Sequence, residues 1–435
     1  MKYFCVGIKG SGMSTLAQIL KDLGNEVSGY DDNPKETFTC EGLYKRDIKI
    51  YTDINHPIDK DTIVTYSKAF SEEHKELKYL HSLNLQFISY NELLGKLTSM
   101  FETTCVCGTH GKTTTSTMIV DVLKNNLGVN YFIGDGSGFA KKDNKLFVIE
   151  SCEYQRHFLA YHPTIAVVTN IELEHTECYD GIEDIIATFN KFANKAKLVI
   201  CCGDDSNVKK LKLEPKKITY GFELDNDVYA TDVVMDSNGS KFNVYYQKKN
   251  LGEFRIPLVG RHMILNSLAS ITVGILYGVD VNIIKDSLNN FVTPKRRFKE
   301  TVVGSNVVID DYAHHPTELE NTIAAARIKY PSKKLVAIFK PNTYSRTEAL
   351  KDDFIRVLKT ADVSYITNID CNREKQEDYP NVNSSMLVDA IPNAKLLLED
   401  DIRELLTYEN AVMVFMSCAN IYTLENEYIK QKTEK

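Results

Sequence analysis

The sequence lacks several features that mark other classes of protein. No run of apolar residues approaches the roughly 20 residues that a membrane span requires, so a membrane is not expected as a partner. No block of basic residues stands out and the net charge is −7, which argues against nucleic acid as a partner. The ten cysteines include no CxxC pair, and five of them lie inside apolar, strand-like runs. That placement favours reduced, buried thiols over disulfides or a zinc site.

What the sequence does contain indicates a soluble globular protein of several domains. Of its 435 residues, 43% are hydrophobic and 26% are charged. That length exceeds one ordinary hydrophobic core and suggests two to four domains. The first twelve residues, MKYFCVGIKGSG, break into glycines too early for a signal peptide, so we expect a cytoplasmic protein. We expect it to be a monomer or a weak homodimer.

The first segment has the pattern strand, glycine turn, helix, strand. Residues 3–8 are apolar, residues 16–23 repeat apolar side chains at helical spacing, and residues 27–30 are typical of the next strand. The turn carries its glycines in the order GxxGxG rather than GxGxxG. A dinucleotide is therefore one candidate ligand, and another nucleotide diphosphate is equally compatible, because such a turn recognises pyrophosphate rather than the base.

The segment CGTHGKTTTS, residues 107–116, predicts a phosphate-binding loop. Glycines allow a tight turn, and the N-terminus of the following helix offers free N–H groups and a positive dipole end. Lys112 would reach the β- and γ-phosphates of a nucleotide, and Thr113 would hold a magnesium ion. The standard Walker pattern places a glycine where Val106 stands, so this loop is shorter than usual. The alternative is a surface turn with a solvated lysine.

Two further polar residues point to the same edge of the predicted central sheet. Residues 145–150 and 164–175 resemble strands, with Glu150 at the end of the first and His175 just past the second. Ligands of open α/β sheets bind at the carboxyl ends of the strands. Alone, Glu150 could be a helix cap and His175 an exposed loop residue. Together with Lys112 they predict an ATP–Mg²⁺ site.

The rest of the chain predicts an insertion and a third unit. Residues 215–260 show more of the alternation that is typical of strands, and they carry turn signals such as DSNGS. This pattern indicates an antiparallel insertion. Asp311 and Lys340 each stand at a strand end in the third unit, again at the edge where ligands bind. The third unit has strand-like runs at 306–312, 334–340, 363–369 and 411–417, with helical patterns at 316–327 and 346–358.

These patterns together predict an α/β protein of three domains. The N-terminal domain is expected to be Rossmann-like and the central domain to hold a P-loop ATPase-type mixed sheet. The C-terminal domain is again expected to be Rossmann-like. The predicted domain boundaries are 1–97, 98–292 and 293–435.

Eight sequence blocks, in order and across all three units, resemble the bacterial Mur ligases. The blocks are GIKGSGMS (7–14), GTHGKTTT (108–115), ESCEYQRHFLAYHP (150–163), TNIELEH (169–175), GRHMILNSLA (260–269), KRRF (295–298), DDYAHHPTEL (310–319) and FKPNTYSRT (339–347). The resemblance implies a first domain that binds the UDP of a sugar substrate, a second that binds ATP, and a third that binds an incoming amino acid.

The resemblance also implies roles for particular residues. The UDP-sugar would be held by Gly7, Gly10, Ser11, Gly12, Met13 and Asp31. The ATP site would consist of Gly108, Thr109, His110, Gly111, Lys112, Thr113, Thr114, Asn266, Arg297 and Asp311. The metal ligands would be Thr113, Glu150 and His175, and the amino-acid site Tyr312, His314 and His315. The catalytic residues would be Lys112, His314 and Arg346.

Three departures from the family pattern stand out. Met263 replaces an asparagine of the adenine-binding motif, and Asn342 stands where a histidine is typical. The segment MSCANI, residues 416–421, replaces a glycine-rich strand end. The last two lie in the acceptor domain, so they bear on the choice of amino acid more than on ATP.

The reaction implied by the resemblance joins L-alanine to the lactyl carboxylate of UDP-N-acetylmuramate, with ATP and Mg²⁺, through an acyl phosphate. His314 or His315 would accept a proton from the amine, although a pair of histidines at a strand-to-helix turn could equally be capping residues. One alternative is a relative that attaches a whole peptide in murein recycling. Two alternatives of other classes are a nicotinamide-dependent oxidoreductase and a non-catalytic nucleotide-binding protein.

Overall fold

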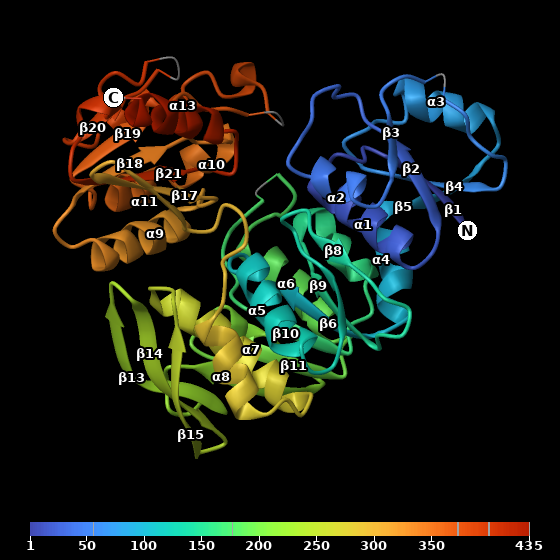
Figure 1. Ribbon diagram of the computed structural model, residues 1–435, viewed down its shortest axis with the longest axis horizontal. Helices are drawn as coiled ribbons and strands as arrows, with labels where there is room; N and C mark the ends of the chain where they lie inside the picture. Colours follow the sequence, from blue (N-terminus) through green and yellow to red (C-terminus); the bar gives the residue numbers. More distant parts are fainter. Residues whose placement is uncertain (55, 176, 372–373, 399–400, 435) are drawn as a thin grey trace.

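The computed structural model describes residues 1–54, 56–175, 177–371, 374–398 and 401–434. The chain forms three α/β domains, each built around its own sheet, and Figure 1 shows the N- and C-terminal domains side by side above the central domain. This confirms the predicted fold class. We retain 1–97, 98–292 and 293–435 as the proposed domain boundaries. Among the described helices, none combines the length and apolar character that a membrane crossing would require.

The N-terminal sheet is parallel throughout, in the order β3-β2-β1-β4-β5. Its first helix buries Leu16, Ala17 and Leu20 against the sheet, as the helical spacing predicts. The strands are β1 Lys2–Val6, β2 Glu26–Tyr30, β3 Lys49–Tyr51, β4 Thr62–Tyr66 and β5 Gln86–Ser89. The helices are α1 Ser11–Asp22, α2 Cys40–Tyr44, α3 Lys75–Ser82 and α4 Tyr90–Ser99.

The central sheet has the order β15-β14-β13-β12-β11-β10-β6-β9-β7-β8. Residues 146–149 and 165–168 of its parallel strands are continuous apolar runs because helices cover both faces of the sheet. Its first strands are β6 Glu102–Cys107, β7 Val129–Phe132, β8 Gly138–Phe139, β9 Leu146–Glu150, β10 Ile165–Val168, β11 Leu198–Cys202 and β12 Lys216–Gly221. The helices are α5 Lys112–Lys124, α6 Ile182–Ala193, α7 Arg261–Leu276 and α8 Val281–Asn289, with 3₁₀ turns η1 Tyr154–Ala160 and η2 Val208–Lys210.

Two details of the central domain differ from the sequence-based expectation. The strand predicted over 164–175 ends at Val168, because the polar segment that follows bonds to the phosphate-binding loop instead of a neighbouring strand. The predicted antiparallel insertion begins later than residue 215, since β12 pairs in parallel with β11. The antiparallel part is β13 Val228–Asp236, β14 Gly239–Tyr246 and β15 Lys249–Ile256, which extends one edge of the sheet.

The C-terminal sheet has the order β16-β17-β21-β18-β19-β20, parallel except for β16. The helix predicted over 346–358 is two helices, because the backbone leaves the helical region at Leu350 (φ −112°, ψ 22°). The strands are β16 Lys299–Val303, β17 Asn306–Asp311, β18 Lys334–Phe339, β19 Val363–Ile366, β20 Ala394–Leu396 and β21 Ala411–Met416. The helices are α9 Pro316–Lys329, α10 Tyr344–Ala349, α11 Lys351–Leu358, α12 Ser385–Val388 and α13 Tyr422–Thr433, with 3₁₀ turns η3 Gln376–Asp378 and η4 Leu405–Thr407.

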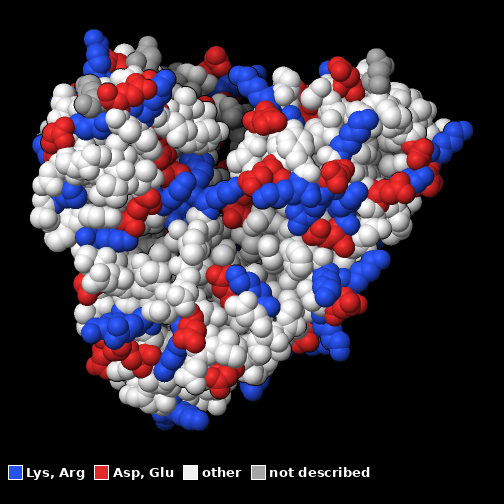
Figure 2. All heavy atoms as spheres, in the orientation of Figure 1, with Lys and Arg blue, Asp and Glu red and all other residues white. Residues whose placement is uncertain are grey.

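The domains meet where the carboxyl ends of their strands lie. The N-terminus of α9 contacts the central domain, with Thr317 Oγ1 donating to Glu172 at 2.7 Å and His110 Nδ1 lying 3.1 Å from Glu318 Oε1. Figure 2 shows that acidic and basic side chains are interspersed on the face in view, and that this face is hollowed between the N- and C-terminal domains. The segments predicted to bind ligands therefore face one another.

Candidate active site

The phosphate-binding loop connects β6 to α5 in two left-handed glycine conformations. Gly108 has φ 141° and Gly111 has φ 80°, which only glycine adopts without strain. Helix α5 then begins at Lys112, so the N–H groups of its first turn point out of the helix end. The loop thus has the backbone needed to bind an anion, as its sequence predicts.

Two amides of the loop are used inside the protein. Thr109 N–H donates to the carbonyl of Asn170 at 3.0 Å, and His110 N–H donates to the Asn170 side chain at 2.8 Å. The amides of Thr109 and His110 are thus not the donors offered to phosphate, because they hold the segment after β10. The N–H groups of the first turn of α5 therefore remain to bind an anion.

Lys112 forms a buried ion pair that the sequence analysis did not foresee. Its ammonium lies 3.0 Å from the carboxylate of Glu153 and donates to the carbonyl oxygens of Gly108 and Thr109 at 2.6 and 3.0 Å. Burial alone would lower the pKa of Lys112, but the Glu153 carboxylate outweighs it and the pKa lies above its ordinary value. The lysine is therefore a fixed positive charge at the loop.

The predicted metal ligands gather around this ion pair. Thr113 Oγ1 donates to Glu150 Oε1 at 3.1 Å, and the Gly134 N–H donates to Glu150 Oε2 at 2.8 Å. His175 Nε2 lies 3.8 Å from the Glu153 carboxylate. Burial raises the pKa of Glu150 and Lys112 opposes that rise. The structure thus brings Lys112, Thr113, Glu150 and His175 together.

These residues fit a magnesium ion. The hydroxyl of Thr113 and the carboxylate of Glu150 are the hard oxygen donors that Mg²⁺ prefers. His175 Nδ1 is buried, forms no hydrogen bond within the described part of the chain, and lies 3.6 Å from Glu177 Oε1 in an ion pair that a metal ion would replace. His175 does not follow a strand directly, contrary to expectation. It lies at the end of an irregular segment and has a left-handed backbone (φ 54°), a conformation that recurs at functional sites.

A cavity of about 300 Å³ lies between the loop and the C-terminal domain. Burial raises the pKa of Asp311, at its rim, to about 6, against the opposing charge of Arg297. Arg297 also donates to Thr113 Oγ1 at 3.4 Å. Six of the residues predicted to bind ATP line the cavity: His110, Gly111, Thr114, Asn266, Arg297 and Asp311.

The substituted Met263 lies on the wall of the same cavity. Its sulfur accepts a hydrogen bond from the amide of Asn266 at 4.0 Å, one helical turn further along α7. A second cavity of about 210 Å³ shares Asn266 with the first and extends towards Asp205 and Tyr220. Met263 therefore orients the remaining asparagine of the motif without adding a polar group of its own.

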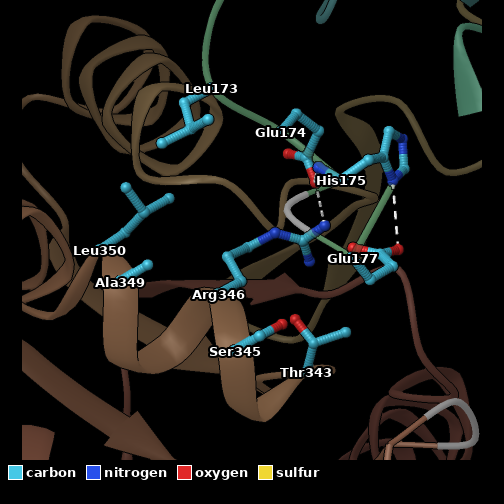
Figure 3. A pocket seen from close by; sticks show the side chains of 9 residues that line it. All are labelled: Leu173, Glu174, His175, Glu177, Thr343, Ser345, Arg346, Ala349 and Leu350. Carbon is cyan, nitrogen blue, oxygen red and sulfur yellow. Dashed lines mark hydrogen bonds and ion pairs between the residues drawn. The ribbon is translucent and has the colours of Figure 1, made fainter. Parts of the chain in front are cut away.

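Arg346 crosses from the C-terminal domain to the central one. Its guanidinium pairs with the buried carboxylate of Glu174 and donates to Asn342 Oδ1 at 2.5 Å. Figure 3 shows Arg346, from α10, reaching Glu174 directly, beside a small cavity of about 10 Å³ that His175 also lines. Asn342, the second departure from the family pattern, thus holds the arginine in place.

The residues predicted for the amino-acid site lie outside that small cavity. His314 Nδ1 lies 2.9 Å from the carbonyl of Tyr312, and burial lowers the pKa of His314 to about 4, so its ring is neutral near pH 7. His315 caps α9, accepting from the Thr317 N–H at 3.3 Å. Tyr312 packs under Arg297, whose guanidinium lies 4.7 Å from the ring. The capping alternative therefore holds for His315 and not for His314.

The glycine turn predicted to bind UDP adjoins the central domain. Gly7 has φ 81° and donates to the carbonyl of Tyr30 at 2.8 Å. A Cβ at Gly12 would lie 2.4 Å from the Tyr90 hydroxyl. Asp31 accepts from the Lys9 N–H at 2.9 Å, which fixes the turn. Gly10 precedes the first residue of α1, Ser11, and Met13 is buried in that helix.

Sequence reasoning missed several acidic residues of the site, namely Glu153, Glu172, Glu174 and Glu318. Each lies within a block that was already prominent, next to a residue that was chosen. The signal was present as acids one or three positions from Glu150, His175 and His315. Which of several neighbouring acids faces the site depends on local backbone, and the left-handed turns at Gln155 and Arg156 reverse the chain just after Glu153.

The fold and the site define a three-domain α/β protein with a phosphate-binding loop that faces its C-terminal domain. Three family models match the chain: Mur ligase family, catalytic domain, at residues 2–102; Mur ligase middle domain at 106–274; and Mur ligase, glutamate ligase domain, at 296–417. The chain belongs to the Mur ligase family, ATP-dependent amide-forming ligases of peptidoglycan precursor synthesis.

Solved structures share the whole fold at low sequence identity. The UDP-N-acetylmuramate–alanine ligase of Thermotoga maritima is 23% identical, with a TM-score of 0.82, covering 100% of this chain and 99% of that one. A murein peptide ligase from Psychrobacter arcticus is 21% identical, with a TM-score of 0.74 and the same coverage. A MurF ligase of Thermotoga maritima, in complex with ADP, is 16% identical, with a TM-score of 0.66, covering 87% and 96%.

Proposed function

We propose that the protein joins L-alanine to the lactyl carboxylate of UDP-N-acetylmuramate, with hydrolysis of ATP to ADP and phosphate. The observation that carries this proposal is the position of Glu153, within 4 Å of both Lys112 and His175. Two of the groups expected to handle a triphosphate thus lie around one carboxylate, and the loop residues Gly111 and Thr114 on either side of Lys112 and Thr113 line the cavity between two domains. A phosphate-binding loop directed at a second domain suits transfer of a phosphoryl group to a substrate held there.

The first step would be attack of the lactyl carboxylate on the γ-phosphate. Both reactants are anions, so the main task of the protein is to offset negative charge. Lys112 is suited to this because its ammonium stays protonated and is already fixed by Glu153. Mg²⁺ bound by Thr113, Glu150 and His175 would neutralise phosphate charge. The product is an acyl phosphate, whose phosphate is a good leaving group.

The second step would be attack of the amino group on the acyl phosphate, with release of phosphate. The amine must lose a proton, and the neutral ring of His314 has its Nε2 available, since Nδ1 is engaged with Tyr312. With a pKa of about 4 this ring is a weak base, so it would accept the proton only as the C–N bond forms and the amine becomes acidic. Arg346, paired to Glu174, would position the reacting groups at the domain junction. Closure of the domains would exclude water from the acyl phosphate.

The main alternative is a ligase that attaches a whole peptide to the same carboxylate. The structural likeness to a murein peptide ligase keeps it open, and the changes at Asn342 and residues 416–421 lie in the acceptor domain. The hypothesis of a nicotinamide-dependent oxidoreductase is no longer needed, because the first glycine turn lies in a segment that matches a Mur ligase family model. We further propose that the protein works as a cytoplasmic monomer or weak homodimer on small-molecule substrates.

One experiment separates these possibilities. ADP release is measured with UDP-N-acetylmuramate, Mg²⁺ and ATP while single amino acids and short peptides are added in turn. The proposal expects L-alanine to stimulate release far more than glycine, L-serine or the tripeptide. Stimulation by the tripeptide alone would favour the recycling ligase, and no stimulation by any acceptor would contradict a ligase of this type.

A further inference from the structure

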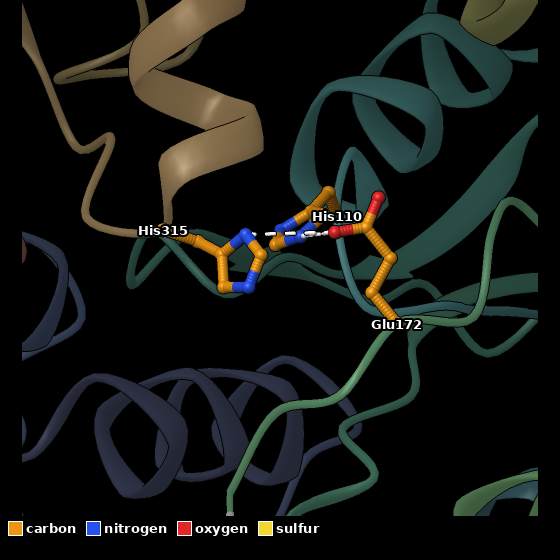
Figure 4. A group of neighbouring side chains, drawn as sticks. All are labelled: His110, Glu172 and His315. Atoms are coloured by element: carbon orange, nitrogen blue, oxygen red, sulfur yellow. Dashed lines mark ion pairs between the residues drawn. The ribbon is translucent and has the colours of Figure 1, made fainter. Parts of the chain in front are cut away.

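A second group of side chains lies where the central and C-terminal domains meet. His110 and Glu172 belong to the central domain and His315 to the start of α9 (Figure 4). Glu172 Oε2 lies 3.4 Å from His110 Nε2 and 3.5 Å from His315 Nδ1. One donor atom from each residue lies within 4.8 Å of the other two. We propose that His110, Glu172 and His315 form a binding site for a transition-metal cation such as Zn²⁺.

The spacing of the three donor atoms suits a tetrahedral ion. Zinc bonds of about 2.0–2.2 Å at tetrahedral angles separate neighbouring ligand atoms by roughly 3.4 Å. The distances from Glu172 Oε2 to His110 Nε2 and His315 Nδ1 already have that value. Coordination through His315 Nδ1 would replace the hydrogen bond that this atom accepts from the Thr317 N–H. Two imidazoles and one carboxylate are donors that select zinc and its neighbours over Mg²⁺, which prefers oxygen.

The surroundings of His110 are those of a metal-binding histidine. Its Nδ1 lies 3.1 Å from Glu318 Oε1, an arrangement in which a carboxylate accepts a hydrogen bond from one ring nitrogen and the other nitrogen faces the cation. The other nitrogen, Nε2, is buried and lies 3.4 Å from Glu172 Oε2, and it forms no hydrogen bond among the residues that the structure describes. Loss of the Nε2 proton would leave the ring in the tautomer and orientation that coordination requires.

The charges around the cluster also suit a dication. Glu172 and Glu318 together carry two negative charges beside the two rings. Burial alone would lower the pKa of His110, yet these two carboxylates raise it to about 10. The proton on His110 therefore occupies the place of the cation, and metal binding would release that proton.

The proposed site is separate from the magnesium site at Thr113, Glu150 and His175. It draws two ligands from the central domain and one from the C-terminal domain, so a bound cation would connect them beside the bond from Thr317 to Glu172. His110 and Glu172 line the large cavity, from which water would supply the fourth ligand. The inference does not depend on the proposed ligase reaction.

Cobalt is the probe for this site, because Co²⁺ shows intense visible bands in a tetrahedral site and weak ones in an octahedral site. The intact protein is freed of metal, kept without nucleotide in excess Mg²⁺, and titrated with Co²⁺ and then Zn²⁺. We expect one equivalent of Co²⁺ to give visible bands that Zn²⁺ abolishes and Mg²⁺ does not. Bands of thiolate charge transfer in the near ultraviolet would instead indicate binding by cysteine.

Four variants locate the bound ion. Glu172→Gln and His315→Gln should each weaken Co²⁺ binding by at least tenfold, with circular dichroism confirming that they are folded. His262→Gln changes another histidine that lines the same cavity, and Glu150→Gln changes the magnesium site; both should keep the bands. The proposal is overturned if the wild-type protein gives no tetrahedral spectrum, or if the spectrum survives in Glu172→Gln and His315→Gln alike.

Discussion

The carboxylate of Glu153 lies 3.0 Å from the ammonium of Lys112, and both side chains are almost entirely buried. Removing one charge of a buried pair leaves the other without compensation, which costs about 3–5 kcal/mol. Lys112→Ala should therefore lower both stability and activity. We expect a clear fall in the melting temperature, and a loss of at least about 10²-fold in acceptor-dependent ADP release.

The double variant Lys112→Met/Glu153→Gln separates the two effects. Neutral side chains of similar volume remove the unpaired charge, so the melting temperature should recover most of the loss seen in Lys112→Ala. ADP release should stay as low as in the single variant, because the cation is still missing. A double variant no more stable than Lys112→Ala would contradict the description of a tightly coupled buried pair.

The glycine turn of the first domain predicts a change in the affinity for the UDP-sugar and not for ATP. In Gly12→Ala the new methyl group would meet the Tyr90 hydroxyl at 2.4 Å, which forces the turn or the ring to move. Overpacking of this kind costs about 1–3 kcal/mol, roughly 5- to 150-fold in affinity. We expect the KM for the UDP-sugar to rise within that range while the KM for ATP is unchanged.

Tyr90→Phe provides the matched control for Gly12→Ala. It removes the oxygen that the methyl group would strike, so the double variant should recover part of the affinity for the UDP-sugar. An equal rise in the KM of both substrates would show that the turn does not act on the UDP-sugar alone.

The sequence was enough to predict strands and turns whose signal lies in a few consecutive residues. Apolar runs located β1, β6, β9 and β17, and the glycines and lysine of residues 108–112 located the loop. Glu153 could not be chosen over its neighbours, because its direction depends on left-handed backbone at Gln155 and Arg156. Glu318 faces His110 from 208 residues away, a contact set by domain packing and not by any local pattern.

Asp311 predicts a pH dependence of nucleotide binding. Burial raises its pKa to about 6, so the carboxylate that would accept a hydrogen bond from the nucleotide is protonated below that pH. ATP affinity should fall about tenfold from pH 7 to pH 5 if only the ionised form binds. In Asp311→Asn the fall should be smaller, and any contribution from protonation of ATP itself is common to both proteins. Equal pH profiles by calorimetry would contradict this role.

Asp311 also has a defined effect on stability. A raised pKa means that the folded state binds the proton more tightly than the unfolded state. This carboxyl group therefore costs stability as the pH rises from about 4 to about 6. The melting temperature of Asp311→Asn should fall less than that of the wild type across this window.

Glu425 offers a test of electrostatics away from the site. It lies on α13, is buried, and its pKa is raised to about 7 by burial and by the nearby charge of Asp310. Since the unfolded value is about 4.3, keeping Glu425 buried costs stability as the pH rises from about 4 to about 7. Glu425→Gln should therefore raise the melting temperature at pH 8, by roughly 2–4 °C for each kcal/mol recovered, and raise it much less at pH 5.

The control for this last prediction is Glu427→Gln, on the exposed face of the same helix, where it accepts a hydrogen bond from Gln431. Loss of an exposed charge in high dielectric alters stability by little at either pH. Differential scanning calorimetry of the three proteins at pH 5 and pH 8 gives the comparison. If Glu425→Gln is no more stable than the wild type at pH 8, then ionising Glu425 in the folded protein does not cost stability, and the prediction is wrong. The same conclusion follows if its advantage is equal at the two pH values.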